Sequence, residues 1–332
     1  MQSYIIYDVI VHSKPEGGRK MSKLLLVVPC YNEEEILPDS AGKLLELLDS
    51  MKRDALVSSD SGILFVDDGS TDATWRIIRE LCDKRPGEIS AVRLAANRGH
   101  QNALFAGLTE AKDRCDISIS IDADLQDDIR VIPEMVRKAE AGADIVFGIR
   151  SDRSSDSWCK RFFAEMFYRF MRCMGVRIIG NHADFRLMSA RAIDALSEYG
   201  EVNLFLRGLV VTLGFETAEV YYKRLPTDRA TRYSIPKMLH LAWDGITSFS
   251  VYPIMMISFA GMAFMLIGLI FLGYILFSKF FGYTVRGWTF LASLIVIFGG
   301  FQTFAIGIIG EYIAKTYLET KRRPKYYIRE RI

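Results

Sequence analysis

The sequence predicts an α/β protein with a mostly parallel sheet, joined to a two-helix membrane hairpin. Three observations lead to this fold class. Short apolar runs alternate with segments of helical spacing over roughly the first 150 residues. Two later segments, 254–277 and 288–310, contain no charged residue. The net charge of +2 is unevenly divided, with −4 on residues 1–250 and +5 on residues 314–332.

Five apolar runs predict the strands of the sheet, at 24–29, 63–66, 89–94, 117–121 and 145–149. Helical spacing between them predicts helices over 33–51, 74–82 and 101–111. Strands and helices that alternate in this order favour parallel strands joined by crossover helices. We therefore assign residues 23–233 to one α/β domain, which follows an N-terminal extension of residues 1–22.

The two uncharged segments are long enough to cross a bilayer, because about 20 helical residues cover its hydrocarbon core of ~30 Å. We predict a transmembrane hairpin over residues 251–313, with its loop at 278–287. Lysine and arginine are more frequent after the second segment than in this loop. The positive-inside rule then places residues 1–250 and a basic tail, residues 314–332, in the cytoplasm. We expect a multi-pass protein of the inner (plasma) membrane.

Two amphipathic stretches are predicted as helices that lie on the bilayer surface. In 157–175 large apolar side chains recur every three or four residues, and most of the charged ones lie on the other side. The segment 234–250 has a similar apolar pattern just before the first predicted span. The alternative interpretation of each stretch is a helix that faces the protein core.

The cysteine pattern and the N-terminus are typical of a cytosolic catalytic part. The five cysteines are scattered without a C-x-x-C pair, which indicates reduced thiols rather than a disulfide framework or a zinc site. The first 20 residues lack the basic start and the cleavage site of a secretory signal.

Polar, mostly acidic clusters follow three successive predicted strands, at Asn32/Glu33, Asp67/Asp68 and Asp122/Asp124. Ligands of open α/β sheets bind beyond the carboxyl ends of the strands, so these clusters predict one site. For Asp67 and Asp68, helix capping is an alternative that is compatible with ligand binding.

Asp122 and Asp124 form a D-x-D pair at the end of an extended segment, where positions i and i+2 project to the same side. At about 5 Å their carboxylates would repel by ~3 kcal/mol, which favours a cation between them. Mg²⁺ or Mn²⁺ is the expected occupant. D-x-D alone is a weak signal, and its position after an apolar strand strengthens it.

No glycine-rich phosphate loop is present, so bound phosphates would need a metal and cationic side chains. The candidate cations are Arg150, Arg186, Arg207, Arg224, Arg229 and Arg232. The last three belong to the basic cluster 223–237, for which anchoring to anionic lipid is an equal alternative.

These motifs resemble family 2 glycosyltransferases with the GT-A fold. The strand-end motifs are Pro29-Cys30-Tyr31-Asn32-Glu33, Val66-Asp67-Asp68-Gly69-Ser70-Thr71-Asp72 and Asp122-Ala123-Asp124-Leu125-Gln126. Later motifs are similar to the polyprenyl-phosphate sugar synthases, a group that includes bactoprenol glucosyltransferases and dolichyl-phosphate mannose synthases. They are Asn97-Arg98-Gly99-His100, Asp184-Phe185-Arg186-Leu187, Leu206-Arg207-Gly208 and Thr231-Arg232-Tyr233-Ser234.

The resemblance implies transfer of a hexose from a UDP- or GDP-linked sugar to undecaprenyl or another polyprenyl phosphate, with no nucleic-acid partner. The implied nucleotide-sugar residues are Pro29, Tyr31, Glu33, Asp67, Asp68 and Gln126. The implied catalytic residues are Asp122, Asp124, Asp184 and Arg186, and the first two would also hold Mg²⁺ or Mn²⁺. The implied acceptor-phosphate residues are Arg207, Arg224, Arg229 and Arg232.

One motif departs from the family pattern, which usually reads Arg-x-x-Gly-x-Ser/Thr-Lys-Tyr. Here Asp228-Arg229-Ala230 leads directly into Thr231-Arg232-Tyr233, without the glycine and with a shorter spacing. Which arginine meets the acceptor phosphate is left open.

Because a phosphate monoester has its second pKa at ~6, it is already largely a dianion at neutral pH and needs no strong general base. We therefore expect a direct displacement that inverts the anomeric centre.

Two other functions remain as alternatives. A processive polysaccharide synthase of the same superfamily would carry Gln-x-x-Arg-Trp, and none of the four glutamines begins that motif. A non-catalytic nucleotide-sugar-binding scaffold for a flippase would tolerate changes in the D-x-D pair. Glucose is the leading sugar, with N-acetylglucosamine, mannose and an amino-arabinose open. A homo-oligomer is also open, since small residues such as Gly299 and Gly300 favour packing between spans.

Overall fold

The computed structural model describes residues 21–151, 182–201, 204–224, 247, 252–281 and 288–332. Its strands are β1 (Leu24–Cys30), β2 (Gly62–Asp67), β3 (Ile89–Leu94), β4 (Ile117–Ser120), β5 (Ile145–Arg150), β6 (His182–Ser189), β7 (Thr217–Tyr222) and β8 (Ile328–Arg331). Its helices are α1 (Leu37–Arg53), α2 (Thr74–Lys84), α3 (His100–Ala111), α4 (Ile132–Glu140), α6 (Ala190–Ser197), α7 (Leu206–Thr212), α9 (Tyr252–Phe280) and α10 (Trp288–Thr320).

The described strands form one sheet in the order β7-β5-β6-β4-β1-β2-β3-β8. Strands β4, β1, β2 and β3 are parallel neighbours, and β5 pairs in parallel with β7. Strand β6 runs antiparallel between β4 and β5, and β8 runs antiparallel at the far edge. The predicted α/β class with a mostly parallel sheet is confirmed, and each of the five predicted strands ends within one residue of its observed bounds.

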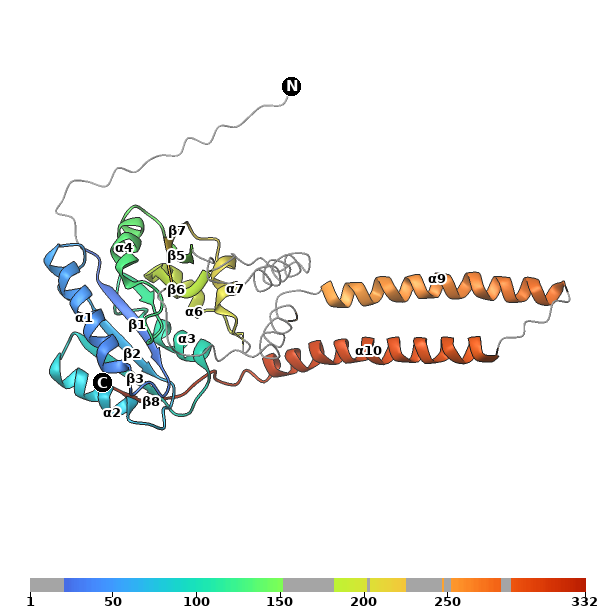
Figure 1. Ribbon diagram of the computed structural model, residues 1–332, viewed down its shortest axis with the longest axis horizontal. Helices are drawn as coiled ribbons and strands as arrows, with labels where there is room; N and C mark the ends of the chain where they lie inside the picture. The colour runs from blue at the N-terminus through green and yellow to red at the C-terminus, as the bar shows by residue number, and fades with distance from the viewer. Residues whose placement is uncertain (1–20, 152–181, 202–203, 225–246, 248–251, 282–287) are drawn as a thin grey trace, which may run out of the picture.

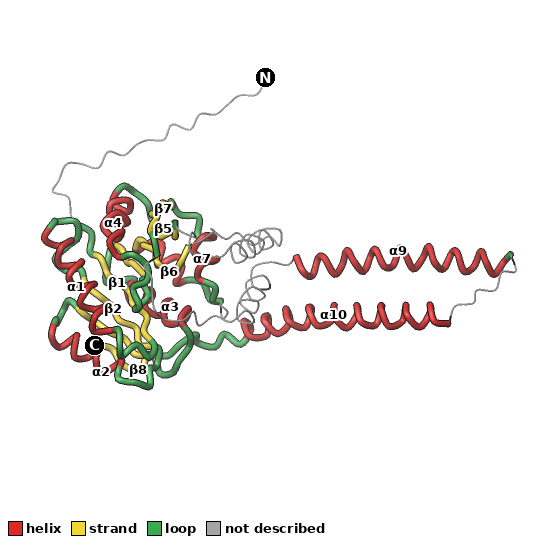
Figure 2. Tube along the Cα trace, in the orientation of Figure 1, coloured by secondary structure: helices red, strands yellow, loops and turns green. Residues whose placement is uncertain are grey.

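Helices cover both faces of the sheet, as Figures 1 and 2 show. Leu24, Leu26 and Val28 of β1 pack into the core that includes α1, α2 and α4, whereas Leu25 and Val27 pack toward α3, α6 and α7. A strand buried on both faces needs a continuous apolar run, which is why the sequence of β1 shows no alternation. At Gly107 of α3 an added Cβ would lie 2.5 Å from Val27 Cγ1, so only glycine allows this close packing.

The first helix begins at Leu37 rather than at residue 33, the predicted start. Pro38 lies in the first turn, where its missing N–H costs no hydrogen bond and its fixed φ suits a helix start. Residues 33–36 instead form a turn, in which the amides of Ile36 and Leu37 both donate to the carbonyl of Glu33.

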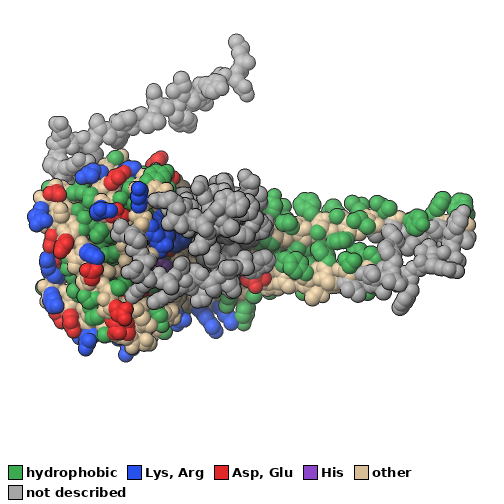
Figure 3. All heavy atoms as spheres, in the orientation of Figure 1, with side chains coloured by type: hydrophobic (Ala, Val, Ile, Leu, Met, Phe, Trp, Pro, Cys, Tyr) green, Lys and Arg blue, Asp and Glu red, His purple; other side chains and the backbone are tan. Residues whose placement is uncertain are grey.

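Helices α9 and α10 extend side by side away from the α/β part (Figure 1), and the rings of Phe298 and Phe301 contact Phe264. Hydrophobic side chains spread over their surfaces (Figure 3). Within the described residues, one segment, Ile297–Thr320, is long and apolar enough to cross a membrane, and the apolar stretch found in α9, Tyr252–Phe264, is shorter. The two predicted helices are present, but a two-helix transmembrane hairpin is not confirmed. The predicted surface helix over 157–175 lies outside the described residues, as does 234–250 except Thr247.

The C-terminal tail contributes an edge strand to the sheet. Strand β8 pairs with β3, and the amides of Ala91 and Ile332 each donate to the other residue's carbonyl at 2.9 Å. The indole N–H of Trp75 donates to Glu330 at 3.2 Å. Residues 314–332, predicted as a basic cytoplasmic tail, continue α10 to Thr320 and then return to the α/β domain.

Deletion of residues 328–332 is expected to destabilise this domain, because it leaves β3 as an unpaired edge and removes the acceptor of Trp75. We expect a loss of about 2 kcal/mol, which corresponds to a fall of roughly 4–8 °C in the unfolding midpoint. Thermal unfolding in detergent measures it. The substitution Arg329→Ala, at an exposed position of the same strand, is the control. An unchanged midpoint after the deletion would contradict the role of β8.

Candidate active site

The loops after β1 and β2 are tied to each other by side-chain hydrogen bonds. Asn32 has φ +53°, a left-handed conformation that asparagine tolerates. Its amide N–H donates to Ser70 Oγ at 3.0 Å, and its side-chain oxygen accepts from the amide of Thr71 at 2.9 Å. The amide of Glu33 donates to Thr74 Oγ1 at 2.8 Å. The two loops therefore form one rim at the carboxyl edge of the sheet.

Asp67 is buried at the end of β2. Its carboxylate pairs with Arg93 Nε at 3.0 Å and accepts from the amide of Ser70 at 3.1 Å. Burial raises the pKa of Asp67, and the bonds from Ser70 and Arg93 oppose that rise. This carboxylate holds the rim loop in shape.

Asp68 is also buried, and it fixes the loop that precedes α3. Its two oxygens accept from the amides of Arg98 at 2.7 Å and Gly99 at 2.9 Å. Burial raises the pKa of Asp68, and these two hydrogen bonds oppose the rise. Asp72, rather than Asp67 or Asp68, accepts from the amide of Thr74 at the start of α2. The contact of Asp67 and Asp68 with a nucleotide stays a prediction.

The remaining residues predicted to hold the nucleotide differ in exposure. Pro29 is buried within β1, whereas Tyr31, just beyond the strand, is 42% exposed. The Tyr31 ring thus offers a flat apolar surface at the rim.

The D-x-D pair lies in a turn, and not in an extended segment as predicted, because β4 ends at Ser120. The amide of Leu125 donates to the carbonyl of Asp122 at 3.1 Å, and Leu125 is buried with φ +46°. The buried leucine anchors the turn and leaves Asp124 exposed.

His100, the first residue of α3, lies between two carboxylates. Its Nε2 is 3.5 Å from Asp122 Oδ1 and 3.5 Å from Asp184 Oδ2. Burial lowers the pKa of His100, but Asp184 and Asp122 outweigh this effect and raise it. The partial burial of Asp122, whose side chain is 43% exposed, raises its pKa to about 6, and Asp184, Asp127 and Asp124 contribute to the rise while His100 opposes it.

Asp184, near the start of β6, is the centre of a buried network. Register pairs Ser120 of β4 with Arg186, so Asp184 lies beyond the end of β4, on the same edge as Asp122. Its carboxylate accepts from Arg186 at 3.1 Å, from Arg207 at 2.9 Å and from Gln101 Nε2 at 3.3 Å. Burial would raise the pKa of Asp184, but Arg207, His100 and Arg186 hold it well below 3.8.

The two arginines of this network differ in access. Arg186 is fully buried and donates to the carbonyl of Leu206 at 3.4 Å, so its position supports Asp184 rather than reaching a substrate. The Arg207 side chain is 40% exposed. Gln101 accepts from the amide of Leu206 at 3.0 Å and thereby fixes the start of α7, which carries Arg207. Arg207 is therefore a cation held at the surface of the site.

Arg224 lies next to Gln126, one of the residues predicted to bind the nucleotide sugar. Its guanidinium donates to the side-chain oxygen of Gln126, two residues after Asp124. The other predicted acceptor-phosphate residues, Arg229 and Arg232, lie outside the described residues.

The carboxylate ligands available at the D-x-D turn fit Mg²⁺ or Mn²⁺. Asp122 and Asp124 offer carboxylate oxygens near enough for the charge of Asp124 to raise the pKa of Asp122. Within the described residues no group of three or more His, Cys, Asp or Glu side chains is arranged to hold a metal ion. Magnesium is commonly held by one or two carboxylates and completed by substrate phosphates and water, so two carboxylates suffice.

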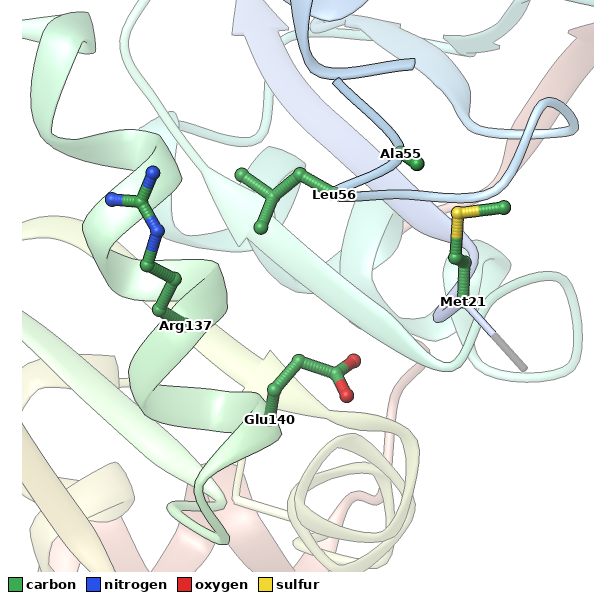
Figure 4. A pocket seen from close by; sticks show the side chains of 5 residues that line it. All are labelled: Met21, Ala55, Leu56, Arg137 and Glu140. Carbon is green, nitrogen blue, oxygen red and sulfur yellow. The ribbon is translucent and has the colours of Figure 1, made fainter. Parts of the chain in front are cut away.

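A cavity of about 270 Å³ lies elsewhere, between Met21, Ala55, Leu56, Arg137 and Glu140 (Figure 4). Met21 precedes β1, Ala55 follows α1, and Glu140 ends α4. These positions belong to the amino-terminal edge of the sheet, opposite the acidic rim. The cavity is therefore separate from the candidate active site.

Sequence reasoning named no role for His100, Gln101, Asp127 or Tyr222, all of which the structure joins to the candidate residues. His100 is the last residue of the Asn97-Arg98-Gly99-His100 motif, and Gln101 follows it directly. The motif could therefore have indicated that both residues belong to the site. Tyr222 carries no such signal, because its partner Asp127 is 95 residues away in the sequence.

Comparisons with known proteins identify relatives over nearly the whole chain. The family model described as glycosyl transferase family 2 matches residues 25–197. The uncharacterized glycosyltransferase YkoT of Bacillus subtilis (strain 168) is 47% identical over 92% of this chain and 90% of its own length. A prophage bactoprenol glucosyl transferase homolog of Escherichia coli (strain K12) is 40% identical over 92% of this chain and 98% of its own.

A bactoprenol glucosyl transferase of Shigella phage SfX is 38% identical and covers 93% of this chain and 99% of its own. Among solved structures, the mannosyltransferase PcManGT of Pyrobaculum calidifontis, in complex with GDP-Man and Mn²⁺, covers 92% of this chain and 88% of its own. It is 14% identical, with a TM-score of 0.43.

The Asp184 network predicts a large loss of stability in Asp184→Asn, about 3–5 kcal/mol, because Arg186 would stay buried without its carboxylate. The folded pKa of Asp184 lies below the ordinary 3.8, so the stabilisation is complete above pH 3.8 and is lost as the pH falls further. Unfolding of variant and parent from pH 3 to 8 measures the difference. Asp194→Asn, which removes an exposed partner of Lys112, is the control and should cost less than about 1 kcal/mol. Equal losses in both variants would contradict the network's role.

Proposed function

The chain belongs to glycosyl transferase family 2, and we propose that this glycosyltransferase moves a hexose from a nucleotide diphosphate sugar to a polyprenyl phosphate. Glucose and undecaprenyl phosphate are the leading donor sugar and acceptor. The observation that carries the proposal is the extent of the likeness to the bactoprenol glucosyl transferases. At 38–40% identity the aligned region covers at least 92% of this chain, so it extends beyond the α/β domain.

The acidic rim would bind the donor. Asp122 and Asp124 would hold Mg²⁺ or Mn²⁺, and the bound ion would offset the charge that develops on the departing diphosphate. Gln126 and the rim residues Tyr31 and Glu33 would bind the rest of the nucleotide sugar. Asp67 and Asp68 would contribute through the loops whose amides they hold.

The acceptor phosphate would bind beside Arg207. A polyprenyl phosphate is largely dianionic near neutral pH, so it requires positioning rather than deprotonation by a strong base. Asp184 holds the guanidinium of Arg207 with three hydrogen bonds of 2.9–3.3 Å. This fixed cation would orient the phosphate for a single displacement that inverts the anomeric centre. Arg224, Arg229 and Arg232 would complete the phosphate site.

Helices α9 and α10 would bring this site to the lipid. We propose that both cross the membrane and that the α/β domain lies on its cytoplasmic side, as the charge distribution favours. The polyprenyl tail would then stay in the bilayer while its phosphate reaches the site at the interface.

The D-x-D pair provides the first test. With labelled UDP-glucose and a short polyprenyl phosphate in detergent, Asp124→Asn should lower the transfer rate on the order of 100-fold or more, because the diphosphate loses its metal-linked partner. The control Asp60→Asn changes an exposed carboxylate at the opposite edge of the sheet and should transfer normally. Equal transfer by Asp124→Asn and the parent would overturn the mechanism.

Metal removal provides an independent prediction. EDTA should abolish transfer, and added Mg²⁺ or Mn²⁺ should restore it, since without a cation between them the two carboxylates would repel the diphosphate. The same assay repeated with UDP-N-acetylglucosamine and GDP-mannose identifies the sugar. Transfer that persists unchanged in EDTA would exclude the metal-dependent mechanism.

A further inference from the structure

Asp127 and Tyr222, both buried, and the partly exposed Arg150 form a cluster next to the D-x-D turn. The Asp127 carboxylate accepts from the Tyr222 hydroxyl at 2.7 Å and from Arg150 Nη2 at 2.9 Å and Nε at 3.2 Å. The side chains of Asp127 and Tyr222 are each 3% exposed. The Asp127 carboxylate is thus paired and hydrogen-bonded, as a buried charge requires.

The cluster is closely packed. The Tyr222 ring meets Phe185 edge to face, with centroids 5.4 Å apart. At Gly148 of β5 an added Cβ would lie within 3.0 Å of both rings. A glycine at this position therefore leaves the space that lets Tyr222 reach Asp127 across the sheet.

The three members come from three separate places in the chain, and each adjoins a part of the candidate active site. Asp127 follows directly after Gln126 in the loop that carries Asp124. Arg150 ends β5, and its neighbour Ser151 donates its amide and hydroxyl to the carbonyl of Tyr222 at 2.8 and 3.0 Å. Tyr222 ends β7, two residues before Arg224, which contacts Gln126.

We propose that Asp127 is a positioning residue, which holds the D-x-D loop in a fixed position relative to the ends of β5 and β7. The inference rests on the proposed function. Residues 152–181 follow β5 in the sequence, and the basic cluster 223–237 follows β7. The carboxylate of Asp127 therefore fixes the loop that carries Asp124 relative to the points where both segments begin. With only 3% of its side chain exposed, Asp127 would act through other residues rather than by touching the donor or the acceptor. Its effect would come through the placement of Asp124, Gln126 and Arg224.

The chain provides a matched control at the other end of β5. Asp144 is also 3% exposed, accepts from Ser189 Oγ at 2.8 Å, and forms a paired contact with Arg191. It lies at the amino-terminal edge of the sheet, away from the acidic rim. Asp127→Asn and Asp144→Asn therefore remove the same charge from similar buried sites, and only the first adjoins the candidate active site.

The test compares both variants in the full-length protein in detergent, with UDP-glucose and a short polyprenyl phosphate. Rates are divided by the folded fraction from thermal unfolding. A misplaced reacting group costs on the order of 10- to 100-fold in rate, so Asp127→Asn should lower kcat by about that factor. The share of donor hydrolysed to free sugar should rise relative to the share transferred. Asp144→Asn should lower stability but leave kcat, KM and this ratio at parent values.

Tyr222→Phe is the second variant, because it removes one hydrogen bond and keeps the ring against Phe185. It should shift the ratio of hydrolysis to transfer in the same direction as Asp127→Asn, and it decides the test if that variant does not fold. If the Asp127 and Tyr222 variants behave like Asp144→Asn, the positioning role is wrong while the proposed function stands. If the parent itself transfers no sugar to the lipid, the proposed function fails instead.

Discussion

The concentration of carboxylates at one edge of the sheet is the constraint on which the site depends. Strands β4, β1 and β2 are parallel neighbours, so the acidic residues that follow them meet at one rim. Each buried carboxylate there has a specific partner. Arg93 pairs with Asp67, Arg150 with Asp127, and Arg186 and Arg207 with Asp184. Asp124 is exposed and Asp122 is 43% exposed, so these two carboxylates remain accessible to solvent at the same rim.

The carboxylates of this rim fall into two electrostatic groups. A paired, buried carboxylate such as Asp184 keeps a low pKa and stays ionised, which fixes Arg207 in one orientation. Asp122 has the opposite shift, because the partial burial of its carboxylate and three neighbouring carboxylates raise its pKa to about 6. Bringing a divalent cation to Asp122 would relieve that repulsion. The stable pairs thus supply rigidity, whereas the carboxylate of Asp122 would be stabilised in its ionised form by a bound cation.

The local sequence patterns predicted the parallel strands of the sheet well. They could not predict the contacts between residues that lie far apart in the sequence. Apolar runs such as 24–29 and 89–94 identify strands because both faces of the sheet are covered. The clusters after β1, β2 and β4 predict the rim, because parallel neighbours end at the same edge. Strand β6 has Arg186 and Asp184 inside it, a polar pattern unlike a buried strand, and its position between β4 and β5 explains their burial. Tyr222 and Gln101 likewise gain their roles from partners far away in the sequence.

The C-terminal tail shows how the site is linked to the two long helices. Only residues 321–327 separate α10 from β8, and seven residues span at most about 25 Å, so the end of α10 stays near the β3 edge. Lys325 donates to the carbonyl of Tyr199 and lies 4.0 Å from the Phe105 ring centroid on α3. Helix α3 begins at His100, between Asp122 and Asp184. One helix therefore contacts the returning tail along its length and the candidate active site at its start, so the basic tail has a structural role that its charge alone does not reveal.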